Sequence, residues 1–376
     1  MDGSHMETFD TIIVGLGAMG SASAYYLSQQ HKVLGLEQFT PAHNLGSSHG
    51  ETRAIREAYF EDPVYVPMVQ RAYDNWSHLE KKAQTSLLKQ VGGLMIGPRD
   101  SLVFRGAEKS AKKHNLAHEI LDAQTIQQRF PSLSPRESMY AVWEPRAGVL
   151  FVEKCIKAYQ KLAQEQGAQL HFSEEVLSWD ATQDNVVVTT TKQKYQAKKL
   201  VLSAGAWITS LVPALKQHLN IERLVQLWFK GRKDYNLCPI NIWEYANNCF
   251  FYSLPDLGEG IKIALHHSGQ ITTVQDLDRN ICENTDIHPV QKLIKTYMPS
   301  VNPEVIRSSV CMYTNTSDGH FIIDNHPQHK NVWIVSPCSG HGFKFASVIG
   351  EIVTSLITAN TTPFPLECFS IKRFSQ

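Results

Sequence analysis

The sequence predicts an α/β protein in which a mixed-sheet α+β domain is inserted into a domain built on a parallel sheet. Two observations support this fold class. A β-branched apolar run at residues 11–14 leads directly into three glycines at G-x-G-x-x-G spacing, Gly15, Gly17 and Gly20. Strand-like and helix-like patterns alternate near both ends of the chain, whereas strand-like runs follow one another in the middle, as in an antiparallel sheet.

The glycine motif is typical of the phosphate-binding turn of a Rossmann-type domain. Apolar residues at helical spacing follow Gly20, and a second strand-like run at 32–36 ends on Glu37. In this type of turn a pyrophosphate approaches the backbone at the helix N-terminus, and an acid about 20 residues further on accepts a hydrogen bond from a ribose hydroxyl. The three glycines and Glu37 therefore predict a dinucleotide cofactor, without distinguishing one dinucleotide from another.

The composition argues against several classes of protein. With 376 residues, the chain is long enough for two globular domains. Its 36 basic residues balance 36 acidic ones and form no polybasic run, so neither nucleic acid nor a membrane is expected as a partner. Asp2, Glu7 and Asp10 stand where a secretory signal would be apolar. The seven cysteines form no C-x-x-C pair, which favours a reducing cytoplasm over a disulfide framework or a metal site.

Apolar periodicity predicts the elements between the motif and residue 219. After a turn-rich loop, the expected elements in chain order are a helix at 64–82, a strand at 92–97, helices at 104–114 and 123–130, a strand at 139–144, a helix at 152–166, and strands at 169–172, 186–189 and 199–204. The last strand is largely apolar and ends at a turn of small residues before Trp207, which is typical of a buried strand in a nucleotide-binding sheet.

The pattern changes beyond residue 219. The expected elements are strands at 224–230, 241–245, 249–253 and 261–266, a helix at 289–297, strands at 321–324 and 332–335, and a helix at 345–359. We therefore assign residues 6–90, 147–218 and 320–376 to the nucleotide-binding domain, and residues 91–146 and 219–319 to a substrate-binding domain. A pocket between two domains is the expected position of a site.

The chain contains four blocks in this order: the glycine motif with Glu37, His49-Gly50-Glu51-Thr52-Arg53, Cys311-Met312-Tyr313-Thr314, and Ser339-Gly340-His341-Gly342-Phe343-Lys344. In this combination it resembles the monomeric sarcosine oxidase and N-methyltryptophan oxidase family of flavoenzymes, over essentially its whole length from Met6. The resemblance implies a monomeric, FAD-dependent amine oxidase. Such an enzyme converts a secondary N-methyl amino acid, O2 and water into the demethylated amino acid, formaldehyde and H2O2.

The resemblance also implies that the FAD is covalently bound. Cys311 would carry the flavin through a thioether to its 8-methyl carbon, which requires a thiolate and hence a cation near the sulfur. An unselected cysteine, in contrast, is more often a small buried hydrophobe. His49 and Arg53 would lie beside the flavin ring. Four backbone positions would approach the cofactor, namely Val176, Gly205, Gly340 and Gly342.

For the substrate, the resemblance implies that Arg56 and Lys344 bind its carboxylate. A guanidinium suits this role because it donates two parallel hydrogen bonds, although Arg53 and Arg56 at a spacing of three also fit a solvated basic edge. Lys262 would stand against the flavin and stabilise the charge that forms as electrons pass to oxygen. On the residues alone, Lys262 and His266 share one face of an alternating strand, for which exposure is the ordinary explanation.

The resemblance further implies that His266, Tyr252 and Tyr313 line the substrate pocket, although tyrosines also occur as core residues whose hydroxyl reaches solvent. The run 241–245 is expected to lie nearby, where Trp243 would either fill the pocket or stack on an aromatic substrate. Sarcosine, N-methyltryptophan, N-methylalanine, pipecolate and proline all remain open as substrates.

Three alternatives to an oxidase remain open. A flavin dehydrogenase of the same fold would pass electrons to another acceptor. An NAD-dependent dehydrogenase would use the same glycines and Glu37, but Cys311 and the Gly-His-Gly-Phe-Lys block would have no role in it. A non-enzymatic nucleotide-binding module would not need arginine, lysine, histidine and tyrosine side chains gathered between two domains.

Overall fold

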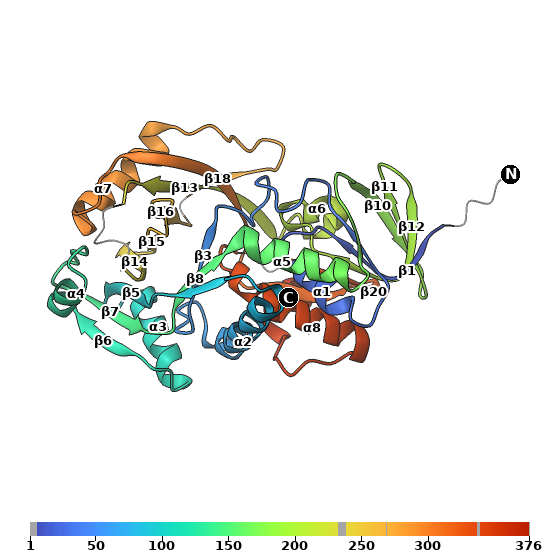
Figure 1. Ribbon diagram of the computed structural model, residues 1–376, viewed down its shortest axis with the longest axis horizontal. Helices are drawn as coiled ribbons and strands as arrows, with labels where there is room; N and C mark the ends of the chain where they lie inside the picture. Colours follow the sequence, from blue (N-terminus) through green and yellow to red (C-terminus); the bar gives the residue numbers. More distant parts are fainter. Residues whose placement is uncertain (1–5, 232–237, 268, 337–338, 376) are drawn as a thin grey trace.

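The computed structural model describes residues 6–231, 238–267, 269–336 and 339–375. Two lobes lie side by side, and the chain passes between them more than once (Figure 1). Within the described ranges, one lobe is built on an eight-stranded sheet and the other on a nine-stranded sheet. The predicted α/β fold with an inserted mixed-sheet region is therefore confirmed.

The eight-stranded sheet has a parallel core in the order β9 (Gln169–His171), β2 (Val33–Leu36), β1 (Thr8–Val14), β12 (Lys194–Leu202) and β20 (His329–Ser336). Antiparallel strands extend it, namely β10 (Val176–Ala181), β11 (Val186–Thr190) and β19 (Ile322–His326). Side chains of β1 alternate between two cores, with Ile13 in one and Ile12 and Val14 in the other. The apolar run before the glycine motif thus forms a strand that is covered on both faces.

Four long helices pack around this lobe, namely α1 (Ala18–Leu27), α2 (Val66–Ala83), α5 (Val152–Glu165) and α8 (Ala346–Ala359) (Figure 1). Helix α1 packs against both α5 and α8. The third glycine of the motif lets the first turn of α1 lie close to the preceding loop, because a Cβ on Gly20 would lie 1.8 Å from the carbonyl oxygen of Gly15. The backbone approach at this turn therefore leaves no room for a side chain.

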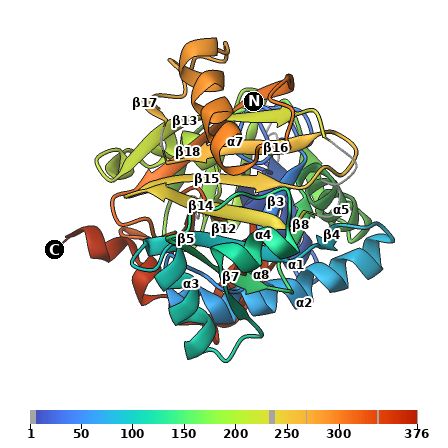
Figure 2. The same cartoon turned by 90° about the vertical axis from the view of Figure 1, so that its left-hand side faces the viewer.

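The nine-stranded sheet runs in the order β17-β13-β16-β15-β14-β5-β7-β6 (Figure 2). Strand β18 pairs with the edge of β13 that faces away from β16 and β17. Its strands are β5 (Gly93–Pro98), β6 (Glu119–Asp122), β7 (Met139–Glu144), β13 (Leu219–Phe229), β14 (Ile240–Ala246), β15 (Cys249–Leu254), β16 (Ile261–His266), β17 (Gln270–Thr272) and β18 (Val305–Thr316). Its helices are α3 (Leu102–Lys113), α4 (Ala123–Arg129) and α7 (His288–Tyr297). Trp243, Phe251 and Tyr297 pack together in its core.

A small antiparallel sheet of β3 (Thr52–Ile55), β4 (Leu88–Gln90) and β8 (Gly148–Phe151) lies between the lobes in Figure 1. The strands of this sheet and of the eight-stranded sheet fall within residues 6–90, 147–218 and 320–376. The strands of the nine-stranded sheet fall within 91–146 and 219–319. We propose these ranges as the two domains.

The helices expected from periodicity are present with displaced ends, and the helix at 64–82 begins with a 3-10 turn, Pro63–Tyr65. Several short strands and one long one, β18, have no counterpart in the sequence pattern. In the part of the chain that the structure describes, no helix is both long and apolar enough to cross a membrane.

Candidate active site

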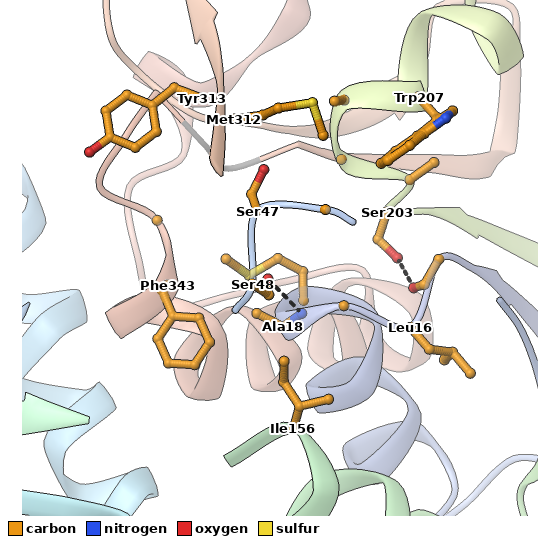
Figure 3. A pocket seen from close by; sticks show the side chains of 18 of the residues that line it. Leu16, Ala18, Ser47, Ser48, Ile156, Ser203, Trp207, Met312, Tyr313 and Phe343 are labelled. Carbon is orange, nitrogen blue, oxygen red and sulfur yellow. Dashed lines mark hydrogen bonds between the residues drawn. The ribbon is translucent and has the colours of Figure 1, made fainter. Parts of the chain in front are cut away.

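An elongated cavity runs from the glycine turn of one lobe to the facing strands of the other. Figure 3 shows Ser203 and Trp207 toward one end, Tyr313 and Phe343 toward the other, and the loop that carries Ser47 between them. The wall is therefore built from both lobes, and the pocket that the sequence predicts between them is present.

The glycine turn and Glu37 form the first end of this cavity. Gly15 has a φ of +89°, in the left-handed region that side chains disfavour. Helix α1 begins after Gly17, which has no side chain to cap it, and the amide of Ala18 donates to Ser48 Oγ at 3.3 Å (Figure 3). Ala18 and Met19, the first residues of the helix, line the cavity. A helix N-terminus in this position is a site for an anion such as a phosphate.

Glu37 is an ionised acceptor beside this turn. Its carboxylate accepts hydrogen bonds from the amides of Leu16, at 2.8 Å, and Phe39, at 3.0 Å, and lies 3.5 Å from Nε2 of His43. Burial raises the pKa of Glu37, but His43 and the amide donors outweigh burial and hold this pKa below its usual value. The charge and position of Glu37 suit the hydrogen bond to a ribose hydroxyl that the sequence predicts.

Several buried polar atoms at the cavity have no partner among the described residues. Ser47 Oγ and Gln226 Oε1 lie in its wall, and His49 Nε2 is buried beside Arg53. Because buried polar groups are normally hydrogen-bonded, Ser47 Oγ and Gln226 Oε1 indicate a polar ligand that completes them, whereas His49 is not part of the cavity wall. The predicted backbone positions also line the cavity, namely Val176, Gly205, Gly340 and Gly342. The cavity therefore fits an elongated, polar cofactor.

Cys311 lies on β18 with a cation next to its sulfur. Its Sγ is 3.7 Å from Nη2 of Arg53 and 3.7 Å from the carbonyl oxygen of Ser47, and both of these residues line the cavity. Arg53 is thus placed to stabilise a thiolate at Cys311. Burial, together with Arg53 and Lys262, lowers the pKa of His49 to about 3, so this imidazole is neutral.

Lys262 is buried, so the exposed position that the alternation of its strand favours is wrong. Its side chain on β16 is 1% exposed, and Nζ donates hydrogen bonds to the carbonyl oxygens of Gly50, at 2.9 Å, and Thr52, at 2.7 Å. The ammonium also lies 5.3 Å from the ring of Trp228, its register partner on β13. Burial and the neighbouring Arg53 lower the pKa of Lys262 well below its usual value.

Arg56 and Lys344 meet at the second end of the cavity, both buried, which excludes a solvated basic edge for Arg56. Nη2 of Arg56 donates to both carboxylate oxygens of Glu61, at 2.8 and 2.7 Å, while Nζ of Lys344 donates to the carbonyl oxygen of His341 at 2.8 Å. Burial and the charge of Arg56 lower the pKa of Lys344 to about 7. An incoming carboxylate would therefore meet two cations and one carboxylate already paired to Arg56.

This pKa predicts how a simple carboxylate binds. A bound acetate stabilises the protonated amine of Lys344, so its affinity should be full below pH 7 and should fall as the pH rises above 7 and the free amine loses its proton. Isothermal titration calorimetry with acetate from pH 5.5 to about pH 9 measures this dependence, since acetate stays ionised throughout. In Lys344→Met the affinity should be low and flat over the same range, and a pH-independent affinity in the unchanged protein would contradict the prediction.

His266 and Tyr313 form a hydrogen-bonded pair beside these cations, with 2.9 Å between Nδ1 and the phenol oxygen. Burial lowers the pKa of His266 well below its usual value, so the imidazole is neutral. Tyr252 also lines the cavity, and burial raises its pKa to about 12. The three residues predicted to line a substrate pocket are thus gathered at one end of the cavity.

The run 241–245 contributes Ile242 to the cavity wall, whereas Trp243 does not line it. Trp243 is fully buried on the opposite face of β14, where its ring stacks on Phe251 with 5.5 Å between centroids. The expectation that Trp243 fills the pocket or stacks on a substrate is therefore wrong.

Two residues of the site were not singled out from the sequence. Glu61 stands in a Glu-Asp-Pro turn that is typical of solvent exposure, and nothing in that pattern indicates its pairing with Arg56. Gln226 could have been recognised as a candidate site residue, because it is a polar residue inside the apolar run Leu224–Phe229. Among the residues with described positions, no group of three or more His, Cys, Asp and Glu side chains could hold a metal ion.

The chain is similar to known proteins over almost its whole length. The family model described as FAD dependent oxidoreductase matches residues 10–356. The monomeric sarcosine oxidase of Streptomyces avermitilis is 38% identical over 378 residues, covering 98% of both chains. The N-methyl-L-tryptophan oxidase of Citrobacter koseri is 34% identical over 373 residues, covering 98% of this chain and 100% of its own. The solved structure of L-proline dehydrogenase from P. horikoshii shares the fold, with a TM-score of 0.85 at 20% identity over 98% of both chains.

Proposed function

Because the chain belongs to the family of FAD-dependent oxidoreductases, we propose that it uses oxygen to oxidise a secondary N-methyl amino acid, releasing the demethylated amino acid, formaldehyde and hydrogen peroxide. The observation that carries this proposal is the pair of buried cations, Arg56 and Lys344, at the end of the cavity opposite the glycine turn. The names of the similar sarcosine and N-methyl-L-tryptophan oxidases support the same class of substrate. The family match also favours FAD over the NAD alternative.

FAD supplies the acceptor for the two electrons of the oxidation. Arg56 and Lys344 bind the substrate carboxylate and so fix the position of the N-methyl group within the cavity. The amine must be neutral to be oxidised, and the cations in the cavity wall, Arg53 included, lower the pKa of a bound amine. The neutral pair His266 and Tyr313 gives the amine hydrogen-bonding neighbours that carry no charge.

Oxygen is the electron acceptor in this proposal, and Lys262 is the residue that serves it. Reduction of oxygen creates negative charge, which a buried cation stabilises more strongly than an exposed one. A dehydrogenase that uses another acceptor has no evident need for a lysine in the position of Lys262, which is 1% exposed and held by two backbone carbonyls.

The FAD is attached through Cys311 in this proposal, since Arg53 supplies the cation that a thiolate requires. Replacing Cys311 with serine should leave a protein whose yellow colour moves entirely from the pellet to the supernatant on acid precipitation, whereas the unchanged protein should keep its colour in the pellet. The exposed Cys249 gives a matched control, because Cys249→Ser should keep its pigment attached. Pigment that is extractable from the unchanged protein would contradict a covalent bond.

An oxygen-uptake screen tests the function itself. We expect oxygen consumption and equimolar peroxide with one or more of sarcosine, N-methyltryptophan, N-methylalanine, pipecolate and proline, and little with the corresponding amides, which lack the carboxylate. Reduction of an artificial dye without oxygen consumption would establish the dehydrogenase alternative instead. A protein that oxidises none of these amines with either acceptor would contradict the proposal.

We also propose that the enzyme acts as a monomer in the cytoplasm. The word "monomeric" in the name of the similar sarcosine oxidases supports the monomer, and the scattered cysteines of the sequence, which form no C-x-x-C motif, support the cytoplasm. Size-exclusion chromatography with light scattering measures the mass of the particle against the 42.4 kDa of one chain.

A further inference from the structure

We infer that Tyr59 is a positioning residue for the substrate carboxylate, because its ring contacts both Arg56 and Lys344 and so holds the two cations together at the end of the cavity. This inference rests on the proposed function, since it takes these two cations to be the carboxylate site.

The geometry of the ring supports this role. Tyr59 is fully buried, and its ring centroid lies 4.4 Å from Cζ of Arg56 and 5.4 Å from Nζ of Lys344. The face of an aromatic ring carries negative partial charge, which attracts cations most strongly where water is excluded. A further ring lies against each cation, Phe60 at 4.2 Å from Arg56 and Phe345 at 5.5 Å from Lys344, and Tyr59 is the ring that the two cations share.

The site needs such a group because its two cations repel each other. Glu61 neutralises Arg56, but its carboxylate occupies both donors of the guanidinium Nη2 that a substrate carboxylate would need. The ring of Tyr59 attracts both cations without accepting any of their hydrogen bonds. It therefore brings Arg56 and Lys344 together without occupying any of their donors, so an incoming carboxylate has only Glu61 to displace from Nη2 of Arg56.

Tyr59 is itself held at both ends. Its hydroxyl lies 2.5 Å from Nδ1 of His341, whose Nε2 lies 3.0 Å from the carbonyl oxygen of Gly319. A carbonyl only accepts, so Nε2 carries the hydrogen, and Nδ1 of the neutral imidazole then accepts from the tyrosine hydroxyl. Ser110 Oγ also donates to the backbone carbonyl of Tyr59. These contacts fix the orientation of the ring toward the cations.

A series of fluorinated rings tests the inference without removing the side chain. Tyr59→Phe is the reference, and 4-fluoro- and 3,4,5-trifluorophenylalanine at position 59 keep nearly the same shape while withdrawing charge from the ring face. The dissociation constants of acetate and of neutral acetamide are measured by calorimetry on the flavin-loaded protein. We expect the acetate constant to rise with each step, by about tenfold for the trifluoro ring, and the acetamide constant to stay within twofold.

The same series at Tyr65 is the matched control. Tyr65 is equally buried, its ring centroid lies 5.0 Å from that of Tyr59, and its hydroxyl also bonds a histidine, His320. Fluorination there should leave acetate binding unchanged. An acetate constant that is flat along the series at position 59 would overturn the role of Tyr59 while leaving the proposed function intact. An unchanged protein that binds acetate no better than acetamide would overturn the carboxylate site, and the inference with it.

Discussion

Replacing Lys262 with methionine should slow the reaction of oxygen with the reduced protein roughly 100- to 1000-fold, while the amine still reduces the flavin at nearly its normal rate. Methionine keeps the length of the side chain but cannot place charge beside the forming oxygen anion. Stopped-flow absorbance separates the two half-reactions, first by mixing protein with amine without oxygen and then by mixing the reduced protein with oxygenated buffer.

Burial and Arg53 push the pKa of Lys262 down, so its positive charge is lost as the pH rises. The oxygen reaction of the unchanged protein should therefore slow toward high pH, whereas that of Lys262→Met should not depend on pH. Lys194→Met, at an exposed position of β12, serves as the control and should change neither half-reaction. Equal slowing of both half-reactions in Lys262→Met would remove Lys262 from the oxygen site.

The glycine turn and the helices could be predicted because their signals are local. Gly15, Gly17 and Gly20 follow a β-branched strand directly, and the motif that they form lies within one short segment of the chain. Helices α2, α3, α5 and α7 have regular apolar stripes that a sequence displays on its own, whereas α1 is buried on nearly all sides. For these elements, tertiary contacts alter only where the helix or strand ends.

Strand β18 shows where such signals fail. It carries Cys311 and Tyr313, yet its twelve residues mix serine, arginine, asparagine and threonine with apolar side chains. This composition suits a strand that contributes to a polar site and pairs along its length with β13, but it does not alternate cleanly. Its existence depends on a partner strand far away in the sequence. The Cys-Met-Tyr-Thr block identified the residues there, although the strand itself was not predicted.

The sequence also does not predict which charged side chains are buried. Lys262 alternates with apolar neighbours as an exposed lysine would, and its buried position is stabilised by the backbone carbonyls of Gly50 and Thr52 and by the ring of Trp228. Trp243 was expected in the pocket but lies on the other face of β14. The pairing of β14 with its neighbouring strands sets which face points to the cavity, and the sequence does not show this pairing. Both outcomes depend on which segments the fold brings together.

Replacing Arg56 with methionine should raise KM for the amino-acid substrate roughly 100-fold or more, with a smaller effect on kcat. The variant removes a guanidinium that can donate two parallel hydrogen bonds to a carboxylate, and it leaves Glu61 buried beside Lys344 without its partner. Steady-state oxygen uptake over a wide range of substrate concentration measures both constants. The matching amide should show little change, because it makes no ion pair with Arg56, and an unchanged KM for the acid would exclude Arg56 from carboxylate binding.

Glu61 determines how this result is to be interpreted, because the substrate must compete with it for Arg56. In Glu61→Gln the competing carboxylate is gone, so KM should fall below that of the unchanged protein, while the melting temperature should also fall because Arg56 is then buried without a charged partner. In Arg56→Met combined with Glu61→Gln, part of the lost affinity should return, since Lys344 no longer faces an unpaired Glu61. The double-mutant cycle separates the direct contact of Arg56 with the substrate from the release of Glu61. An unchanged KM in Glu61→Gln would mean that Glu61 does not compete with the substrate at this site.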